Sequence, residues 1–172
     1  ICYWCIAVDL PGYGNSPRLK SQVTIEKYAD LLAEFVENLF DGSVILVGHS
    51  MGGMISITMA ERHPELINKL ILISPTVTGK LSTYINTIVS PITRLEQYSS
   101  TRFLSRFIER VSSSITDRIM RPASFAQRTG ITTEAYVRLK EDARRPDQGV
   151  VRAECFEAMR NNNLSGRLSD VS

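Results

Sequence analysis

One stretch of the sequence restricts the possible folds more than any other, because it asks for a strand, a tight turn and a helix in direct succession. The run from Ser43 to Val47 is short, apolar and rich in β-branched residues, which favours a buried strand. It leads into Gly48-His49-Ser50-Met51-Gly52-Gly53, after which a helix is expected from about 51 to 62, ended by His63-Pro64. Such a turn presents its central residue at the carboxyl end of the strand.

The same alternation continues on both sides of this turn. The apolar run over residues 1–8 predicts a strand, near 3–9, and Thr24 can cap a helix that extends to about Phe40. A further strand is expected at 69–74. Strands that alternate with helices predict the α/β class, with a doubly wound, mainly parallel sheet. The strands at 43–48 and 69–74 should be direct neighbours, since a short helical crossover favours adjacency.

The pattern changes after Pro75, where no further strand signal occurs. Amphipathic helices are expected at 81–110, 116–128, 132–144 and 149–161, so residues 77–165 are interpreted as a helical insertion. Residues 1–76 carry 5 basic and 8 acidic side chains, and residues 77–172 carry 15 and 10. The bases are interspersed with acids and the net charge is only +2, so no nucleic-acid partner is expected.

Ser50 is the candidate nucleophile. A tight strand-to-helix turn brings the residues two before and two after the nucleophile close together, so only very small side chains fit there. Gly48 and Gly52 meet this requirement. Gly53 should let the helix pack close to the strand. Backbone N–H groups at the helix N-terminus favour negative charge developing beside Ser50. The alternative interpretation is a glycine-rich turn that carries an incidental serine.

Neither histidine suits the role of general base for Ser50. His63 lies 13 residues further along a helix, which is about 20 Å at 1.5 Å per residue. His49 is the immediate neighbour, so its ring should project away from the seryl side chain and line a wall of the site. Asp147 and Asp170 follow no strand and are assigned surface or capping roles.

Other patterns in the sequence predict no cofactor and no metal. Gly12-x-Gly14 lacks the third glycine and the following helix of a dinucleotide site, and Gly79-Lys80-Leu81 lacks the remainder of a phosphate loop. Cys2-x-x-Cys5 lies within a strand-like run, where packing is favoured over redox chemistry, and no disulfide framework is expected. No apolar run reaches the ~18 residues that suggest a membrane helix.

Three segments together resemble the α/β-hydrolase family, in particular its esterase, lactonase and carbon–carbon hydrolase branch. They are Val8 to Ser16, Val47 to Gly53, and His63-Pro64-Glu65 leading into Leu70 to Pro75. The resemblance implies that Ser50 is the nucleophile and that the Met51 N–H forms half of an oxyanion hole. It divides the chain into a core at 1–76, a helical cap at 77–165 and a return to the core at 166–172. Phe103 and Phe107 in this cap, together with His49, are candidate substrate contacts.

The resemblance also implies what lies outside residues 1–172: the second oxyanion donor, the catalytic acid and histidine, and a strand between those at 3–9 and 43–48. The chain is therefore expected to be the middle of such an enzyme and inactive alone. We expect an open slot between these two strands, roughly 9–10 Å wide. The alternative is direct pairing between them, which would remove two bare edges.

The expected function is hydrolysis of an ester, thioester or related acyl bond in a small, largely apolar substrate, through an acyl-Ser50 intermediate. The alternatives are carbon–carbon bond hydrolysis or acyl transfer on the same fold, and a ligand-binding receptor that has lost turnover. The expected partner is a small molecule. Substrate identity and oligomeric state are not indicated, and among compartments the cytoplasm is favoured.

Overall fold

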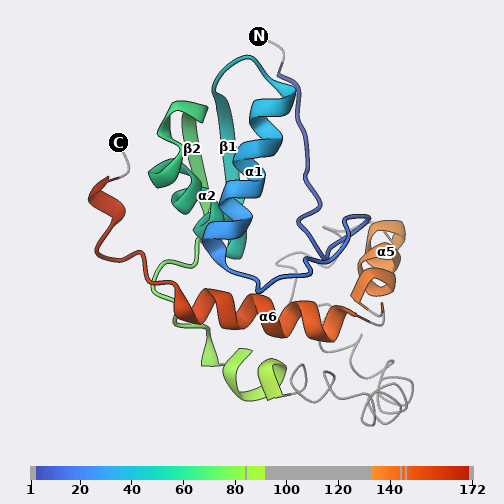
Figure 1. The fold of residues 1–172 in the computed structure, drawn as a ribbon. Helices are drawn as coiled ribbons and strands as arrows, with labels where there is room; N and C mark the ends of the chain where they lie inside the picture. The colour runs from blue at the N-terminus through green and yellow to red at the C-terminus, as the bar shows by residue number, and fades with distance from the viewer. Residues whose placement is uncertain (1–2, 84, 92–132, 144, 146, 171–172) are drawn as a thin grey trace.

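A computed structural model of the chain describes residues 3–83, 85–91, 133–143, 145 and 147–170. Figure 1 shows a small parallel sheet with helices packed on one of its faces and a long helix across its lower end. In chain order the described elements are α1 (Ile25–Leu39), β1 (Val44–His49), α2 (Met51–Arg62), the 3-10 helix η1 (Pro64–Leu66), β2 (Ile67–Ile73), the π-helical segment η2 (Ile85–Val89), α5 (Thr133–Ala143), α6 (Gln148–Asn161) and the 3-10 helix η3 (Leu168–Asp170).

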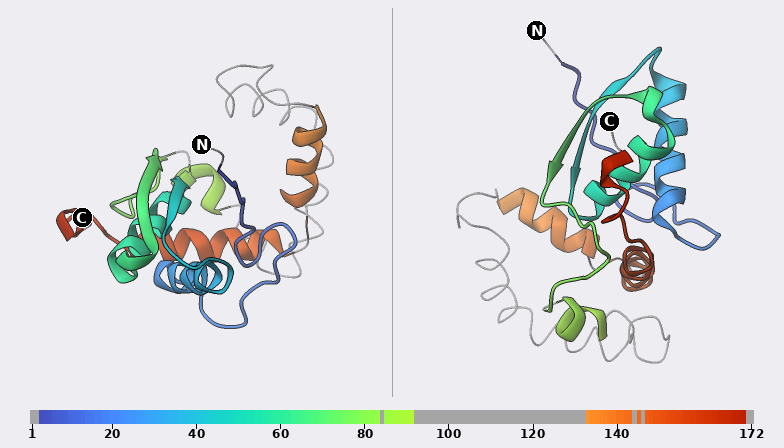
Figure 2. Two further views of the ribbon diagram at one scale, coloured as in Figure 1. Left: turned by 90° about the horizontal axis from the view of Figure 1, so that it is seen from above. Right: turned by 90° about the vertical axis from the view of Figure 1, so that its left-hand side faces the viewer.

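The sheet confirms the predicted neighbours. Strands β1 and β2 pair in parallel, with Leu46 opposite Leu70 and His49 opposite Ile73. Helix α2 makes the crossover between them, and α1 packs beside it on the same face of the sheet (Figure 2). The predicted bounds at 43–48, 51–62 and 69–74 agree with the observed elements to within two residues at each end, because local apolar periodicity decides these segments.

The segment near residues 3–9, predicted as a strand, has no regular secondary structure from residue 3 to residue 10. Tyr3 and Trp4 are 68% and 92% exposed. A strand needs a neighbour for its N–H and C=O groups, and among the described strands β1 pairs only with β2. The strand prediction is therefore wrong for this structure, and so is the alternative of direct pairing with β1.

Helix α1 is positioned by its cap and by one apolar face. The Thr24 side chain accepts a hydrogen bond from the Lys27 N–H at 3.1 Å, as a Ser/Thr N-cap should. The buried face carries residues that pack on α2 and α6, whereas Leu39 at the far end is 54% exposed. The fully buried side chains of this core, all less than 2% exposed, include Ile25, Tyr28, Met54, Ile55, Ile57, Met59, Val151, Cys155 and Leu164.

Helices α5 and α6 confirm the expected helices at 132–144 and 149–161. Helix α6 runs across the carboxyl ends of β1 and β2 (Figure 1) and buries Val151, Cys155 and Met159 in the core. Its C-terminal end meets the chain that leaves β2: the Leu164 N–H donates to the Val77 carbonyl at 2.8 Å. No strand follows Ile73 within the described residues. The predicted helix at 116–128, and residues 92–110 of that at 81–110, lie outside them.

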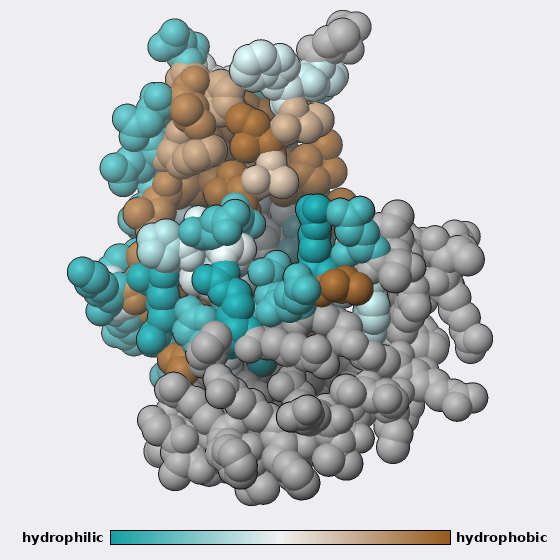
Figure 3. All heavy atoms as spheres, turned by 90° about the vertical axis from the view of Figure 1, so that its right-hand side faces the viewer, coloured by the Kyte–Doolittle hydropathy of each residue, from teal (hydrophilic) through white to brown (hydrophobic). Residues whose placement is uncertain are grey.

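The second face of the sheet carries apolar side chains that no described element covers. Along β1, partly buried residues alternate with exposed ones up to Gly48, as expected when only one face of a sheet is packed. Figure 3 shows apolar residues gathered in the upper part of one side of the molecule. The large exposed apolar residues of the strands and the N-terminal segment are Tyr3, Trp4, Ile6, Val8, Ile45, Val47, Ile71, Leu72 and Ile73.

Candidate active site

Ser50 occupies the turn between β1 and α2 in a backbone conformation that side chains rarely adopt. Its φ is 53° and its ψ is −116°. A non-glycine residue in such a region costs about 1–3 kcal/mol and persists only where its surroundings hold it. The residue is exposed, and within the described part of the chain its hydroxyl makes no hydrogen bond. The turn therefore presents an unengaged hydroxyl at the carboxyl end of β1.

The glycines around Ser50 have unequal roles. A Cβ on Gly48 would lie 2.5 Å from the Gly52 carbonyl oxygen and 2.5 Å from Ser56 Oγ, so no larger residue fits without displacement. A Cβ on Gly52 would meet nothing within 4 Å. The expectation that both positions lack space is therefore correct for Gly48 and wrong for Gly52. Gly53 is also restricted, but by Pro75 Cβ at 2.6 Å rather than by a side chain of the strand.

Both backbone polar groups of Ser50 are engaged. Its N–H donates to the Ile73 carbonyl at 3.2 Å, and its carbonyl accepts from the N–H groups of Thr76, Gly53 and Met54 at 3.0, 3.1 and 3.3 Å. By contrast, no hydrogen bond among the described residues uses the Met51 N–H. This N–H belongs to the first turn of α2, where the helix dipole favours a negative charge. It is thus available to an oxyanion beside Ser50.

The structure places His63 away from Ser50, at the opposite end of α2. Its Nε2 lies 2.9 Å from Asp30 Oδ1, and Arg62 donates to both Asp30 oxygens at 2.8 and 2.9 Å. The hydrogen bonds from Arg62 hold the pKa of the Asp30 carboxyl below its usual value. His63 therefore ties α2 to α1, which agrees with its exclusion as a base.

Among the other candidates, only His49 adjoins the turn at Ser50. His49 is the last residue of β1 and is exposed. Asp147 occupies the N-cap position of α6 without a side-chain capping bond, and Asp170 ends η3. Phe103 and Phe107 lie outside the described residues. Within the described ranges, no three His, Cys, Asp or Glu residues gather so as to hold a metal ion.

One group of contacts had no local signal in the sequence. The loop after Asp9 is held against α6, where the buried Gln148 donates from Nε2 to the Gly12 carbonyl at 2.7 Å and Arg145 donates to the Gly14 carbonyl. Gly12 has a φ of 92°, and a Cβ there would lie 3.0 Å from Val151. Only the glycine-rich composition of the loop indicated a close approach, and it did not indicate the partner.

A buried thiol joins the same loop to α1 and α6. Tyr13 donates to Cys155 Sγ at 3.3 Å, while Tyr28 Oη lies 3.5 Å from the same sulfur and donates to the Pro11 carbonyl at 3.1 Å. Burial raises the pKa of both tyrosine hydroxyls and of the Cys155 thiol. All three groups therefore stay protonated at neutral pH and act as a packing contact.

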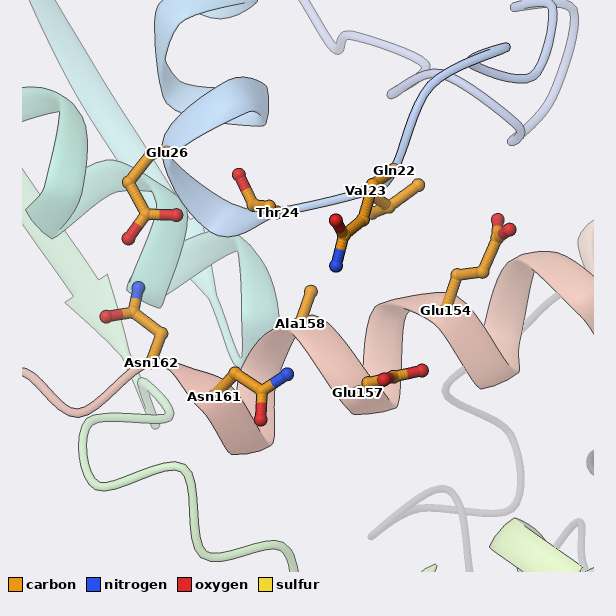
Figure 4. Close-up of a pocket in the computed structure, with 9 residues that line it drawn as sticks. All are labelled: Gln22, Val23, Thr24, Glu26, Glu154, Glu157, Ala158, Asn161 and Asn162. Atoms are coloured by element: carbon orange, nitrogen blue, oxygen red, sulfur yellow. The ribbon is translucent and has the colours of Figure 1, made fainter.

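A polar cleft of about 280 Å³ lies between the start of α1 and α6 (Figure 4). Its lining includes neither Ser50 nor any other residue of the turn from Gly48 to Gly52, and it contains three glutamates. Because Ser50 does not line this cleft, we place the candidate chemistry at the Ser50 turn. The lining residues are Gln22, Val23, Thr24, Glu26, Glu154, Glu157, Ala158, Asn161 and Asn162.

Helices of the described part of the chain fall short of the length and hydropathy that a membrane crossing requires.

The chain is 40% identical over 72 residues to the uncharacterized hydrolase YugF of Bacillus subtilis, and the aligned residues make up 41% of this chain and 26% of that protein. It is 38% identical over 71 residues to lipase LipV of Mycobacterium tuberculosis, covering 41% and 27% of the two chains. A 2-(acetamidomethylene)succinate hydrolase of Mesorhizobium japonicum is 38% identical over 68 residues, which cover 40% of this chain and 24% of that protein.

The matched region thus spans about a quarter of the length of these relatives. A broader match comes from the profile of a whole family, described as the alpha/beta hydrolase fold, which covers residues 3–136. That range contains β1, the Ser50 turn, α2 and β2, whose parallel sheet and helices are consistent with part of that fold. The chain belongs to the α/β-hydrolase fold family.

Proposed function

We propose that this chain carries the nucleophile of a serine hydrolase, which cleaves an ester, thioester or related acyl bond in a small, largely apolar substrate. The observation that carries the proposal is the turn at Ser50. It combines a strained backbone, an exposed hydroxyl without a partner among the described residues, and an unused Met51 N–H at the start of α2. The nucleophile and an oxyanion donor thus belong to two consecutive residues, at the N-terminus of α2 where the helix dipole favours negative charge.

The reaction proceeds in two steps. In the first, Ser50 Oγ attacks the acyl carbon while its proton passes to a general base, and the carbonyl electron pair moves onto an oxyanion that accepts from the Met51 N–H. Collapse of this intermediate releases the alcohol or thiol, which takes the proton from the base, and leaves acyl-Ser50. In the second, water attacks the acyl carbon, gives a proton to the base and releases the acid, while Ser50 recovers its proton.

The base and its acidic partner are proposed to come from outside residues 1–172. His63 is occupied by Asp30, and Ser50 has no histidine partner among the described residues. A second oxyanion donor is required as well, because a single N–H makes only half of such a site. The chain by itself is therefore proposed to be inactive although it holds the nucleophile.

Residues 77–165 are proposed to be the cap over this site, with 1–76 as the core and 166–172 as the return. The hydrogen bond between Val77 and Leu164 supports this division, since an insertion must begin and end at one place. A cap excludes water and selects the substrate. His49, Phe103 and Phe107 are proposed as substrate contacts.

A second candidate reaction is carbon–carbon bond hydrolysis or acyl transfer on the same nucleophile. Two relatives, from Mesorhizobium japonicum and Acinetobacter baylyi, are named as hydrolases of substituted methylenesuccinates, which are not simple esters. A receptor without turnover is the third candidate. The tight fit at Gly48 and the strained Ser50 argue against it, because a protein that only binds has no need of either.

The nucleophile is tested by reacting the full-length protein with a fluorophosphonate probe. Ser50 Oγ should bond to phosphorus with loss of fluoride, and peptide mass spectrometry should locate the adduct on Ser50. The Ser50→Ala variant should not be labelled, whereas the Ser56→Ala variant, which lacks a buried serine of α2, should be labelled as the wild type is. Labelling that is unchanged in Ser50→Ala would refute the proposal.

A further inference from the structure

The chain that leaves β2 encloses the backbone of Ser50 from two sides. The Ile73 carbonyl accepts from the Ser50 N–H at 3.2 Å, and the Thr76 N–H donates to the Ser50 carbonyl at 3.0 Å. We call residues 73–76 the bracket. Its first bond continues the β1–β2 ladder by one residue, and its second reaches past the end of the sheet.

Within the bracket, Ser74 has a φ of 44°. Besides Ser50, it is the only non-glycine residue in the described ranges with a positive φ. Positive φ is a conformation that side chains adopt reluctantly, and glycine and asparagine tolerate it best. It occurs here between the two residues that bond to Ser50, so the turn at Ser74 is what lets Ile73 and Thr76 reach the two peptide groups that flank the Ser50 Cα. Two strained residues, Ser50 and Ser74, therefore lie on neighbouring strand ends, and Ser50 bonds to Ile73 and Thr76 on the two sides of Ser74.

Pro75 completes the bracket on the side of α2. A Cβ on Gly53 would lie 2.6 Å from Pro75 Cβ and 2.9 Å from Pro75 Cα, so the proline is in close contact with the first turn of the helix. Proline fixes its own φ and has no N–H, so it stiffens the bracket without adding a donor that could compete for the Ser50 carbonyl. The bracket thus touches both the turn and the helix that supplies the Met51 N–H.

We infer that Ser74 is a positioning residue for Ser50, and that its left-handed backbone, not its hydroxyl, is the property that matters. This inference rests on the proposed function. The bracket engages the N–H and the carbonyl of Ser50, fixes the strained φ, and leaves the Met51 N–H as the donor available beside the hydroxyl. If the bracket relaxes, Ser50 can return to an ordinary conformation, and hydroxyl and donor then no longer point at one acyl group.

A series of substitutions at Ser74 separates this role from a chemical role of its hydroxyl. Ser74→Gly and Ser74→Asn keep or improve tolerance of a positive φ, Ser74→Ala lowers it, and Ser74→Val lowers it most, because a β-branched residue is a genuine outlier there. If the hydroxyl acted chemically, glycine, asparagine and alanine would all lose activity. If the backbone conformation matters, the glycine and asparagine variants retain activity.

The experiment measures the rate constant of fluorophosphonate labelling at Ser50 in the full-length protein, with the melting temperature of each variant. We expect Ser74→Gly and Ser74→Asn to react within about twofold of the wild type and Ser74→Val about tenfold more slowly. Ser74→Ala should fall between them. With a substrate that the protein hydrolyses, kcat of the Ser74→Ala and Ser74→Val variants should fall with little change in KM. If Ser74→Val does not fold, the order of the glycine, asparagine and alanine variants decides the question.

Equal rates across the series would overturn the inference, as would a loss in Ser74→Gly equal to that in Ser74→Ala. Failure of the proposed function gives a different result. In that case the wild type is labelled no faster than Ser50→Ala, whatever residue stands at 74. Labelling that depends on Ser50 but not on residue 74 would support Ser50 as the nucleophile and would refute the positioning role of Ser74.

Discussion

Replacing Gly48 by alanine should destabilise the protein far more than replacing Gly52, although the two glycines flank Ser50 symmetrically in the sequence. The Cβ on residue 48 would lie 2.5 Å from both the Gly52 carbonyl oxygen and Ser56 Oγ. Carbon and oxygen atoms in ordinary contact stay about 3.3–3.6 Å apart, so an overlap of about 1 Å must be relieved. At Gly52 there is nothing within 4 Å to displace.

The magnitude follows from what has to move. The Gly52 carbonyl accepts from Ser56 Oγ at 2.7 Å, so turning it away breaks a hydrogen bond worth about 1 kcal/mol. Overpacking of a tight site adds about 1–3 kcal/mol. Gly48→Ala should therefore lose about 2–4 kcal/mol, and Gly52→Ala should gain up to about 1 kcal/mol from helix propensity.

Thermal unfolding of the full-length variants, followed by circular dichroism, measures the difference. At about 2–4 °C per kcal/mol for a domain of about 150–250 residues, Gly48→Ala should melt about 4–16 °C below the wild type. Gly52→Ala should melt at the wild-type temperature or slightly above it. Melting temperatures that agree within about 2 °C for the two variants would refute the steric reasoning.

The remaining predictions concern the contacts of α6 and the completeness of the site. Residues 1–172 alone should hydrolyse p-nitrophenyl acetate no faster than background, and turnover that disappears in Ser50→Ala would contradict the assignment of the base outside this range. Because burial holds the pKa of Tyr13 and Tyr28 above the unfolded value of about 10, their contribution to stability should be full well below pH 10 and should fall above it, by up to about 1.4 kcal/mol per pH unit for each tyrosine. Urea unfolding between pH 10 and 11 should show a shallower slope in Tyr13→Phe and Tyr28→Phe, and an unchanged slope would argue against the burial of these hydroxyls. Gln148→Ala should lose about 1–3 kcal/mol, since it leaves the Gly12 carbonyl without this donor, whereas the exposed Glu141→Ala should change stability by less than about 0.5 kcal/mol in the same urea titration. Equal losses in these two variants would contradict the role of the buried amide.

The sequence predicted the elements whose formation depends on nearby residues. Thr24 caps α1, the run ending at Val47 forms β1, and Pro64 follows the end of α2, all because caps and apolar periodicity act over a few residues. The pairing of β1 with β2 also followed, since a short crossover leaves little choice of neighbour.

Contacts between distant segments could not be predicted in this way. The segment around Ile6 has the composition of a strand, but a strand also requires a partner, and composition does not supply one. Gly52 belongs to the same motif as Gly48, yet only atomic positions distinguish a crowded glycine from one that faces open space. The bracket at Ser74 was missed because serine gives no local sign of a positive φ.

The hydrogen bond between Val77 and Leu164 has a consequence for how such a protein can diversify. The excursion between these two residues begins and ends at one point, and within it α6 returns to pack in the core. The closure entropy of such an excursion grows only slowly with its length, so insertions and deletions before α6 should be tolerated at small cost. Helix α6 has to be kept, because it buries Val151, Cys155 and Met159 in the core, whereas the part of the excursion before it can vary between related proteins.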